Sequence, residues 1–256
     1  DEFRNVMALY RRYYTHLRFE GFRVRLSLHD KDKGKFVDNE TEWLRSEDIV
    51  RNVLREENID FSEEAGEAAF YGPKMDIQAT NIIGREETIS TCQLDFVMAE
   101  RFDLTYVDRD GAEKRPYIIH RAPLGTHERM ISFLIELYGG AFPTWMAPLQ
   151  VRLIPVKDSC VAYARELEGV LREKLIRADV DVADDSFNKK IRNAVTHKIP
   201  NMWIIGEKEV EQRHVTWRRY SVKDQIVASA EKAIDAVTAM REGRLMDNFE
   251  DVSIPV

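Results

Sequence analysis

The sequence has little of what marks fibrous, disulfide-stabilised or membrane-spanning proteins. Its 256 residues include only two cysteines, 12 glycines and eight prolines. Two cysteines exclude a disulfide framework and an all-cysteine zinc site. The low glycine and proline contents exclude a fibrous or low-complexity chain. No apolar run approaches the roughly 18 to 20 residues that a membrane helix needs. These absences favour a globular protein of the reducing cytoplasm, with no membrane as a partner.

An excess of positive charge is also absent, although the charge is unevenly distributed. Lys and Arg number 38 against 45 Asp and Glu, which gives a formal net charge of -7. Residues 1–150 carry all of this excess, with 20 basic and 27 acidic residues, whereas residues 151–256 carry 18 of each. Within the second part, residues 187–223 hold nine basic and three acidic residues. The acidic total therefore conceals a local basic surface of the kind that attracts phosphate groups.

The hydrophobic pattern of the first part predicts an α+β fold in which an antiparallel sheet packs with helices. Apolar residues recur at helical spacing, and in the second expected helix Trp43, Leu44 and Val50 should point inward. Alternating or apolar runs joined by short turns favour antiparallel strands. The expected helices are residues 1–17, 40–57 and 126–138, and the expected strands are residues 23–28, 75–82, 87–97 and 115–121.

The pattern changes after a proline-punctuated junction at residues 141–148. Strand-like and helix-like segments then alternate, which predicts a small α/β domain with a mixed sheet. The expected strands are residues 150–156, 180–183, 201–205 and 214–220, and the expected helices are residues 158–177, 189–197 and 223–240. A length of 256 residues favours two domains. Because the helix-like pattern is already present at Asp1, we expect the chain to be part of a longer protein.

The densest group of chemically active side chains lies between His120 and Arg129. It follows a predicted strand through a tight turn into a predicted helix. Backbone N–H groups at a helix start suit an anion, and Arg129 could stack on a base or neutralise a phosphate. The alternative is a surface salt bridge for Arg129 and an ordinary hydrogen-bonded role for His120. His120 alone cannot make a metal site, because zinc needs three or four ligands.

Two further motifs could face the same site. The turn Tyr71-Gly72-Pro73-Lys74 places a phenol and an ammonium on one loop, where Lys74 could meet a phosphate. Gly-Pro also occurs in turns with no function. Gln93 and Asp95 alternate with apolar neighbours, so both should lie on one face of their strand. An ordinary amphipathic strand would show the same pattern. Neither a phosphate-binding glycine loop nor a nucleophile elbow is present.

Five short motifs follow one another along the chain. They are Tyr71-Gly72-Pro73-Lys74, Gln93-Leu94-Asp95-Phe96, His120-Arg121-Ala122 through Leu124-Gly125-Thr126 to Glu128-Arg129, Phe142-Pro143-Thr144-Trp145, and Gly206-Glu207-Lys208-Glu209. Together they resemble the threonyl-tRNA synthetases, which are class II aminoacyl-tRNA synthetases. The resemblance implies that residues 1–146 are the later half of a class II catalytic domain. Residues 147–245 would then be an anticodon-binding domain, and residues 246–256 a C-terminal tail.

The resemblance also implies the role of each residue in the first domain. His120 would be one of three protein ligands of a zinc ion that binds the amino and hydroxyl groups of threonine, and the other ligands would lie upstream of residue 1. Such a metal rejects valine better than an apolar pocket does. Arg129 would stack on the adenine of ATP, which binds with Mg2+, and Lys74 would face the adenylate phosphate as the second catalytic residue. The residues expected to line the same pocket are Tyr71, Gln93, Asp95 and Thr126.

In the second domain, the resemblance assigns anticodon recognition to Glu209 and Arg218, with Lys190 and Arg192 nearby. Hydrogen bonding and stacking are the usual means of reading splayed RNA bases, and the basic stretch supplies attraction to phosphates. The implied activity is ATP-dependent activation of threonine and its transfer to tRNA(Thr), by a homodimeric cytoplasmic enzyme. Because the family's first two signature motifs are absent, we expect the 256-residue chain to be inactive alone.

Two other functions remain open from the sequence. A non-catalytic RNA-binding or regulatory relative could lack the upstream motifs naturally, although the retention of Lys74, His120 and Arg129 argues against it. A prolyl-type synthetase is disfavoured by the stretch His120-Arg121-Ala122. The encoded sequence upstream of Asp1 would decide the first alternative. A comparison of threonine, proline and serine activation would decide the second.

Overall fold

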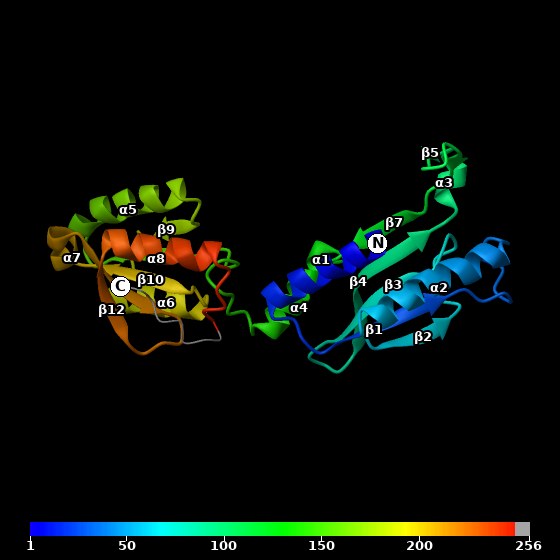
Figure 1. Cartoon of the computed structure of the whole chain (residues 1–256). Coiled ribbons are helices and arrows are strands. Elements are labelled where there is room, and N and C mark those ends of the chain that lie inside the picture. The colour runs from blue at the N-terminus through cyan, green and yellow to red at the C-terminus, as the bar shows by residue number, and fades with distance from the viewer. Residues whose placement is uncertain (249–256) are drawn as a thin grey trace. The chain divides into compact units, whose positions relative to one another are not determined.

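The computed structural model describes residues 1–248, which form two compact units (Figure 1). The first unit runs from Asp1 to Glu136 and the second begins at Leu137. The domain boundary expected from the sequence, between residues 146 and 147, lies ten residues after this division and stays a prediction. Among residues 1–248, no helix combines the length and the apolar character needed to cross a membrane.

The first unit is built on a five-stranded sheet in the order β2-β1-β3-β4-β7. Antiparallel pairs join β1 to β3, β3 to β4 and β4 to β7, whereas β1 and β2 are parallel. A separate two-stranded hairpin consists of β5 and β6. The strands are β1 (Phe22–Leu28), β2 (Phe61–Ala65), β3 (Lys74–Thr80), β4 (Glu86–Asp95), β5 (Tyr106–Val107), β6 (Glu113–Lys114) and β7 (Ile118–Ala122).

Helices cover one face of this sheet and leave the other face polar. The helices are α1 (Glu2–Leu17), α2 (Glu40–Glu56), the short α3 (Met98–Arg101) and α4 (His127–Leu137). Ion pairs between Arg4 and Glu56 and between Arg11 and Glu57 join the α1 and α2 segments, which lie on the same side of the sheet (Figure 1). The Tyr10 hydroxyl of α1 donates to the carbonyl of Thr91 on β4.

Two sequence predictions for the first unit were wrong in detail. Leu44 is 52% exposed, because the buried stripe of α2 follows Trp43, Glu47 and Val50 at helical spacing and Leu44 lies beside it. The sheet is mixed rather than wholly antiparallel, because an unpredicted strand, β2, pairs in parallel with β1. Helix α2 provides the crossover between these two parallel strands, as such pairs require.

The second unit is a five-stranded mixed sheet in the order β12-β11-β10-β8-β9, with helices on both faces. Buried residues of α5 and α8 pack with Trp203 and Trp217 on one face, whereas α6 packs with Ile154 and Met202 on the other. The strands are β8 (Val151–Pro155), β9 (Ala178–Val180), β10 (Asn201–Ile205), β11 (His214–Arg219) and β12 (Gln225–Ser229). The helices are η1 (Asp158–Cys160), α5 (Val161–Glu173), α6 (Phe187–Thr196), α7 (Glu207–Gln212) and α8 (Ala230–Glu242). The predicted α/β domain with a mixed sheet is therefore confirmed.

The prediction of a closing helix at residues 223–240 was wrong for the first part of that segment. Residues Gln225–Ser229 instead form β12, which pairs with β11 at the edge of the sheet. Helix α8 begins only after Ser229, whose hydroxyl accepts a hydrogen bond from the N–H of Lys232. A serine N-cap marks this start because it satisfies a backbone N–H that has no partner within the helix.

The beginning of the expected C-terminal tail is packed into the second unit. Asp247 is buried, and its carboxylate accepts hydrogen bonds from the N–H and the hydroxyl of Thr144, both at 2.8 Å. The guanidinium of Arg219, also buried, donates to the Asp247 carbonyl at 2.5 Å. Residues 246–248 therefore belong to the folded unit, and the remainder of the predicted tail lies outside the described residues.

Candidate functional site

A row of polar residues crosses three neighbouring strands of the first unit. Lys74 on β3 lies directly opposite Gln93 on β4, and Gln93 lies directly opposite His120 on β7. Directly opposed residues of antiparallel strands share one face of the sheet. The structure therefore brings together three residues that the sequence placed in separate motifs.

The Tyr71-Pro73 turn lies against the end of β4 and places Tyr71 over this row. The N–H of Leu94 donates to the Pro73 carbonyl at 3.0 Å, and the N–H of Phe96 donates to the Tyr71 carbonyl at 3.2 Å. A Cβ atom at Gly72 would lie 1.9 Å from the Leu94 carbonyl oxygen, so only glycine permits this approach. The Tyr71 hydroxyl donates to Gln93 Oε1.

The surroundings of Tyr71 also affect its acidity. Its ring centroid lies 5.3 Å from that of His120. Burial, and secondly the charge of Asp95, raise the pKa of the Tyr71 phenol. Tyr71 therefore remains a protonated hydrogen-bond donor at neutral pH, next to the one imidazole of the row.

Asp95 does not line an open pocket as the sequence suggested. Its side chain is fully buried. Oδ1 accepts hydrogen bonds from the N–H groups of Val97 and Met98, at 2.8 and 2.9 Å, and Oδ2 lies 2.8 Å from His120 Nε2. The alternative of a hydrogen-bonded His120 is thus confirmed for one ring nitrogen. The His120 side chain is nevertheless 44% exposed.

Lys74 is held by a buried carboxylate that sequence reasoning missed. Its Nζ lies 3.0 Å from Oδ2 of Asp76, which also accepts hydrogen bonds from the Ser27 hydroxyl at 3.0 Å and from Arg25 Nη2 at 3.2 Å. The signal was available in the sequence, because Lys74 and Asp76, like Arg25 and Ser27, alternate with apolar residues. The partly exposed ammonium of Lys74 is thereby oriented while remaining open to an anion.

Arg129 and Thr126 lie toward the other end of β4. Arg129 Nη1 donates to the Thr88 carbonyl at 2.5 Å, and the Arg129 N–H donates to the Thr126 hydroxyl oxygen at 3.3 Å. Along the strand, Thr88 is five residues from Gln93, which corresponds to about 16 Å. Within the described part of the chain, no carboxylate lies within ion-pairing distance of Arg129, so the alternative of a surface salt bridge is wrong. The polar row and Arg129 could therefore contact the two ends of an extended ligand.

The chain offers His120 as a single metal donor rather than a complete metal site. Among residues 1–248, no three His, Cys, Asp or Glu side chains are grouped so that they could hold a metal ion. The donor chemistry of His120 nevertheless fits one zinc ligand, because its Nε2 is fixed by a carboxylate in the manner common behind zinc-bound histidines. Any further ligands would have to come from outside the described residues.

In the second unit, Glu209 and Arg218 flank the same face of the sheet. Glu209 Oε1 accepts a hydrogen bond from the Thr216 hydroxyl at 2.7 Å, and Oε2 accepts one from the Gly206 N–H at 2.9 Å. Thr216 and Arg218 alternate with the buried Val215 and Trp217, so both point away from the core shared with α5 and α8. Arg218 lies directly opposite Met202, which α6 covers.

Glu209 is ionised at neutral pH in this setting. Burial is the largest influence and raises its pKa. The hydrogen bonds from Thr216 and the backbone, together with the charge of Lys208, outweigh burial and leave the Glu209 pKa below its ordinary value. The hydrogen bond from Thr216 to this carboxylate also holds α7 against β11.

The basic stretch at residues 187–223 is partly neutralised by acids from outside it. Lys189 pairs with Asp185, Arg213 with Glu166 and the buried Arg219 with Asp247. Among residues 1–248, no carboxylate lies within 4.0 Å of the charged groups of Lys190, Arg192 or Arg218; Lys190 donates to the Asp181 carbonyl at 3.1 Å. Cations on α6 and β11 that the resemblance names are therefore among those left without a carboxylate partner in the described part of the chain, together with Lys198, Lys208 and Lys223.

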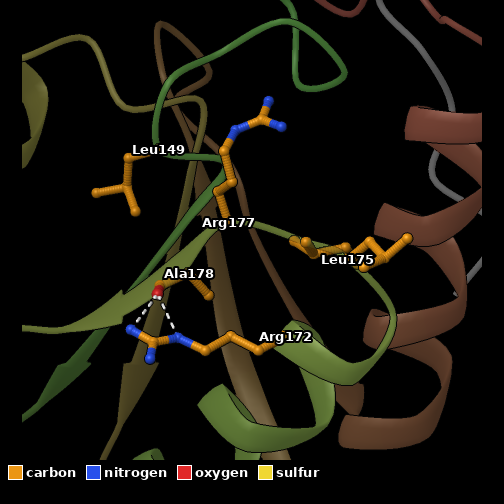
Figure 2. Close-up of a pocket in the computed structure, with 6 residues that line it drawn as sticks. Leu149, Arg172, Leu175, Arg177 and Ala178 are labelled. Carbon is orange, nitrogen blue, oxygen red and sulfur yellow. Dashed lines mark hydrogen bonds between the residues drawn. The ribbon is translucent and has the colours of Figure 1, made fainter.

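A hollow of about 410 Å³ at the end of α5 is not part of this face (Figure 2). It is lined by Leu149, Leu175 and two arginines. Arg177 donates to the carbonyls of Ala147 and Pro148, and Arg172 pairs with Glu168. Because both guanidinium groups are occupied within the fold, the hollow presents mainly apolar surface.

Comparison with known proteins decides the family. Residues 1–138 match the family described as the tRNA synthetase class II core domain (G, H, P, S and T). The chain belongs to this class II synthetase family. Residues 150–240 match the family described as the anticodon binding domain. Both domains inferred from the resemblance are therefore confirmed.

Similar synthetases extend well beyond this chain. Threonine–tRNA ligase of Geobacillus kaustophilus is 45% identical over 226 residues, which are 88% of this chain and 35% of the relative. Threonine–tRNA ligase of Streptococcus sanguinis is 45% identical over 241 residues, which are 93% of this chain and 37% of the relative. The chain thus spans about a third of the length of these relatives. A crystal structure of the RNA binding domain of threonyl-tRNA synthetase from Cryptosporidium parvum superposes with a TM-score of 0.85 at 31% identity, covering 93% of this chain and 60% of that one.

Proposed function

We propose that the chain is the C-terminal part of a threonine–tRNA ligase, which activates threonine with ATP and transfers it to tRNA(Thr). The observation that carries the proposal is the row Lys74, Gln93 and His120 on one sheet face, with Arg129 at the far end of β4. A row of this kind suits an aminoacyl-adenylate, which has an amino acid at one end and a base at the other. The similarity to threonine–tRNA ligases supports the choice of substrate.

In this proposal the chain's residues act by binding and orientation. Lys74, oriented by Asp76, neutralises the phosphate of ATP and of the adenylate, to which Mg2+ also binds. Arg129 stacks its planar guanidinium on the adenine. Tyr71 and Gln93 donate and accept hydrogen bonds beside the reacting groups, and Thr126 holds the first turn of α4. Positioning of this kind lowers the barrier without covalent chemistry by the protein.

His120 supplies one ligand of a zinc ion in the proposed enzyme. A bound zinc ion would select a substrate that has both an amino and a hydroxyl group, because an amino acid without the hydroxyl leaves a coordination position unsatisfied. Two protein ligands have to come from elsewhere in the protein, since the described residues offer one. Two buried, unpaired cysteines, Cys92 and Cys160, support a cytoplasmic location, and the family resemblance supports a homodimer.

The proposal is tested with the protein encoded by the gene's complete open reading frame. We expect pyrophosphate exchange with ATP to depend on threonine, with serine weaker and valine and proline inactive. The 256-residue chain alone should show no exchange above background, because it spans about a third of the related ligases. Equal activity with proline, or no exchange with any amino acid by the complete product, would contradict the proposal.

Replacement of Arg218 by alanine should weaken the binding of tRNA(Thr) by about 10- to 100-fold, as loss of a base-reading arginine does. Arg218 has no ion-pairing carboxylate among residues 1–248, so little of its charge is used within the fold. Threonine-dependent pyrophosphate exchange should be unchanged. The measurement is a tRNA titration followed by fluorescence, at two salt concentrations to separate base contacts from phosphate contacts.

The matched control is Arg165→Ala. Arg165 carries the same charge but lies on α5, which covers the opposite face of the sheet. Its guanidinium forms an ion pair with Glu168 of the same helix. We expect this variant to bind tRNA like the unmodified protein. Equal weakening by both substitutions would mean that general charge, rather than the face of β11, attracts the RNA.

A further inference from the structure

We propose that Asp95 is a positioning residue that holds His120 in one tautomer, with the proton on Nε2 and the lone pair of Nδ1 available to a metal ion. Asp95 thereby acts through His120 and does not contact the substrate. The part of the inference that concerns zinc rests on the proposed function. The part that concerns the tautomer depends only on the described residues.

The carboxylate of Asp95 is committed to hydrogen bonds on both oxygens. Oδ1 accepts from the N–H groups of Val97 and Met98, at 2.8 and 2.9 Å. These two donors fix the orientation of the carboxylate, because a backbone N–H can only donate. Oδ2 therefore faces His120 Nε2 at 2.8 Å, and the ring nitrogen has to be the donor. In a neutral imidazole, a proton on Nε2 leaves Nδ1 as an acceptor.

The surroundings of His120 leave Nδ1 accessible. The side chain is 44% exposed, and within the described part of the chain no group lies within hydrogen-bonding distance of Nδ1. The Tyr71 ring lies beside the imidazole, with the planes tilted by 52°, and limits its rotation. The buried carboxylate and the aromatic ring thus hold the imidazole with one nitrogen inward and the other available.

The complete burial of Asp95 excludes direct contact with a ligand in the open part of the site. Its side chain is 0% exposed, and each of its contacts is to the chain itself. The strand alternation places Asp95 on the same face as Gln93, but the backbone at Val97 and the His120 ring cover it. Its role in this fold is therefore to orient a neighbour, as carboxylates do behind many metal-binding histidines.

A second histidine–carboxylate pair in the same unit has the opposite arrangement. His29 Nδ1 lies 2.7 Å from Glu47 Oε1, and the same oxygen accepts the backbone N–H of His29 at 2.9 Å. The proton of the neutral His29 ring should accordingly be on Nδ1. The two histidines provide an internal comparison, since one chain should show both tautomers in one spectrum.

The experiment is a two-bond 1H–15N correlation spectrum of the uniformly 15N-labelled 256-residue chain, recorded at a pH where both rings are neutral. The spectrum distinguishes protonated from unprotonated ring nitrogens. We expect an unprotonated Nδ1 for His120 and an unprotonated Nε2 for His29. A His120 ring protonated on Nδ1 in the unmodified chain would overturn the inference.

Asp95→Asn should reverse the tautomer of His120. The amide oxygen would keep the two bonds from Val97 and Met98, so the NH2 group would face Nε2 and require it to accept. The proton would then move to Nδ1, where it blocks a metal. The matched control is Glu47→Gln, in which one oxygen can keep both bonds to His29, so neither histidine should change tautomer.

A folded Asp95→Asn chain in which His120 keeps its proton on Nε2 would overturn the inference. Should this variant not fold, the spectrum of the unmodified chain alone decides the outcome. In the complete gene product, we expect Asp95→Asn to weaken zinc binding by about 10- to 100-fold, as measured by competition with a chromophoric chelator. Zinc binding that is unaffected by this substitution would also overturn the inference. A complete product that binds no zinc at all would contradict the zinc part of the proposed function instead, and the tautomer measurement would still decide the role of Asp95.

Discussion

Replacing Arg129 with alanine should lower kcat/KM for ATP by at least about 100-fold in threonine-dependent pyrophosphate exchange by the complete gene product. The guanidinium is exposed, donates to the Thr88 carbonyl and lacks an ion-pairing carboxylate among residues 1–248. It is therefore oriented by the fold and available to a ligand. Its removal deletes both the planar stacking surface and the positive charge. The free energy of unfolding should change little, because the side chain is exposed and makes a single hydrogen bond within the described part of the fold.

Arg129→Lys separates these two contributions. Lysine keeps the charge but lacks the planar group, so the loss should be intermediate if stacking and charge both act. Arg85→Ala is the matched control, because it removes an exposed arginine from the turn between β3 and β4, outside the polar row. Exchange by Arg129→Ala at the rate of the unmodified enzyme would refute the assignment of Arg129 to the ATP site.

The sequence offered candidate site residues but not the strand register that brings some of them together. Alternation in β3 and β4 indicates that Lys74 shares a face with Asp76, and Gln93 with Asp95. Placing Lys74, Gln93 and His120 in one row requires the pairing of three strands, and a shift of one residue would turn a strand's side chains to the other face. A β-bulge between Ile77 and Gln78 changes this register within β3 and β4. The row was therefore visible only in the structure.

The elements that were missed are short, namely α3, α7 and the β5–β6 hairpin, or are strands only because of the strand they pair with, namely β2 and β12. Strand β2 is short and carries exposed glutamates, and it is a strand because β1 supplies its hydrogen bonds. Strand β12 looked like the start of a helix because its residues have no strong alternation, and its pairing with β11 overrides that local preference. By contrast, α1, α2 and α5 have long apolar stripes, and each was predicted within a few residues at its start.

Asp95 shows where pattern alone is insufficient for a functional assignment. Its position two residues from Gln93 correctly indicated a shared face, but pattern cannot show what covers a side chain on that face. The structure buries Asp95 beneath His120 and the Val97 backbone. Burial depends on the path of the chain after β4, which turns at Phe96 into the short helix α3. The structure therefore changes the role assigned to Asp95 from contacting the substrate to orienting His120.

Gly125→Ala should lower the free energy of unfolding of the first unit by about 2 to 5 kcal/mol. Gly125 lies between β7 and α4 with a φ of +56°, and a Cβ atom there would lie 2.2 Å from the Ile89 carbonyl oxygen on β4. Strain in the left-handed backbone costs about 1 to 2 kcal/mol, and the backbone clash adds to it. The measurement is urea unfolding followed by circular dichroism.

Gly111→Ala distinguishes the clash from the backbone strain. Gly111 has a φ of +76° in the turn between β5 and β6, but no atom lies within 4 Å of the Cβ position. This control should therefore cost only about 1 to 2 kcal/mol, the contribution of the left-handed backbone. Gly125 also joins the strand of His120 to the helix of Arg129, so relief of the clash must move α4 relative to β4. We accordingly expect Gly125→Ala to raise KM for ATP in the complete product even below its unfolding temperature, whereas Gly111→Ala should not. Equal unfolding free energies for the two variants would show that the contact with Ile89 is not what requires glycine at this turn.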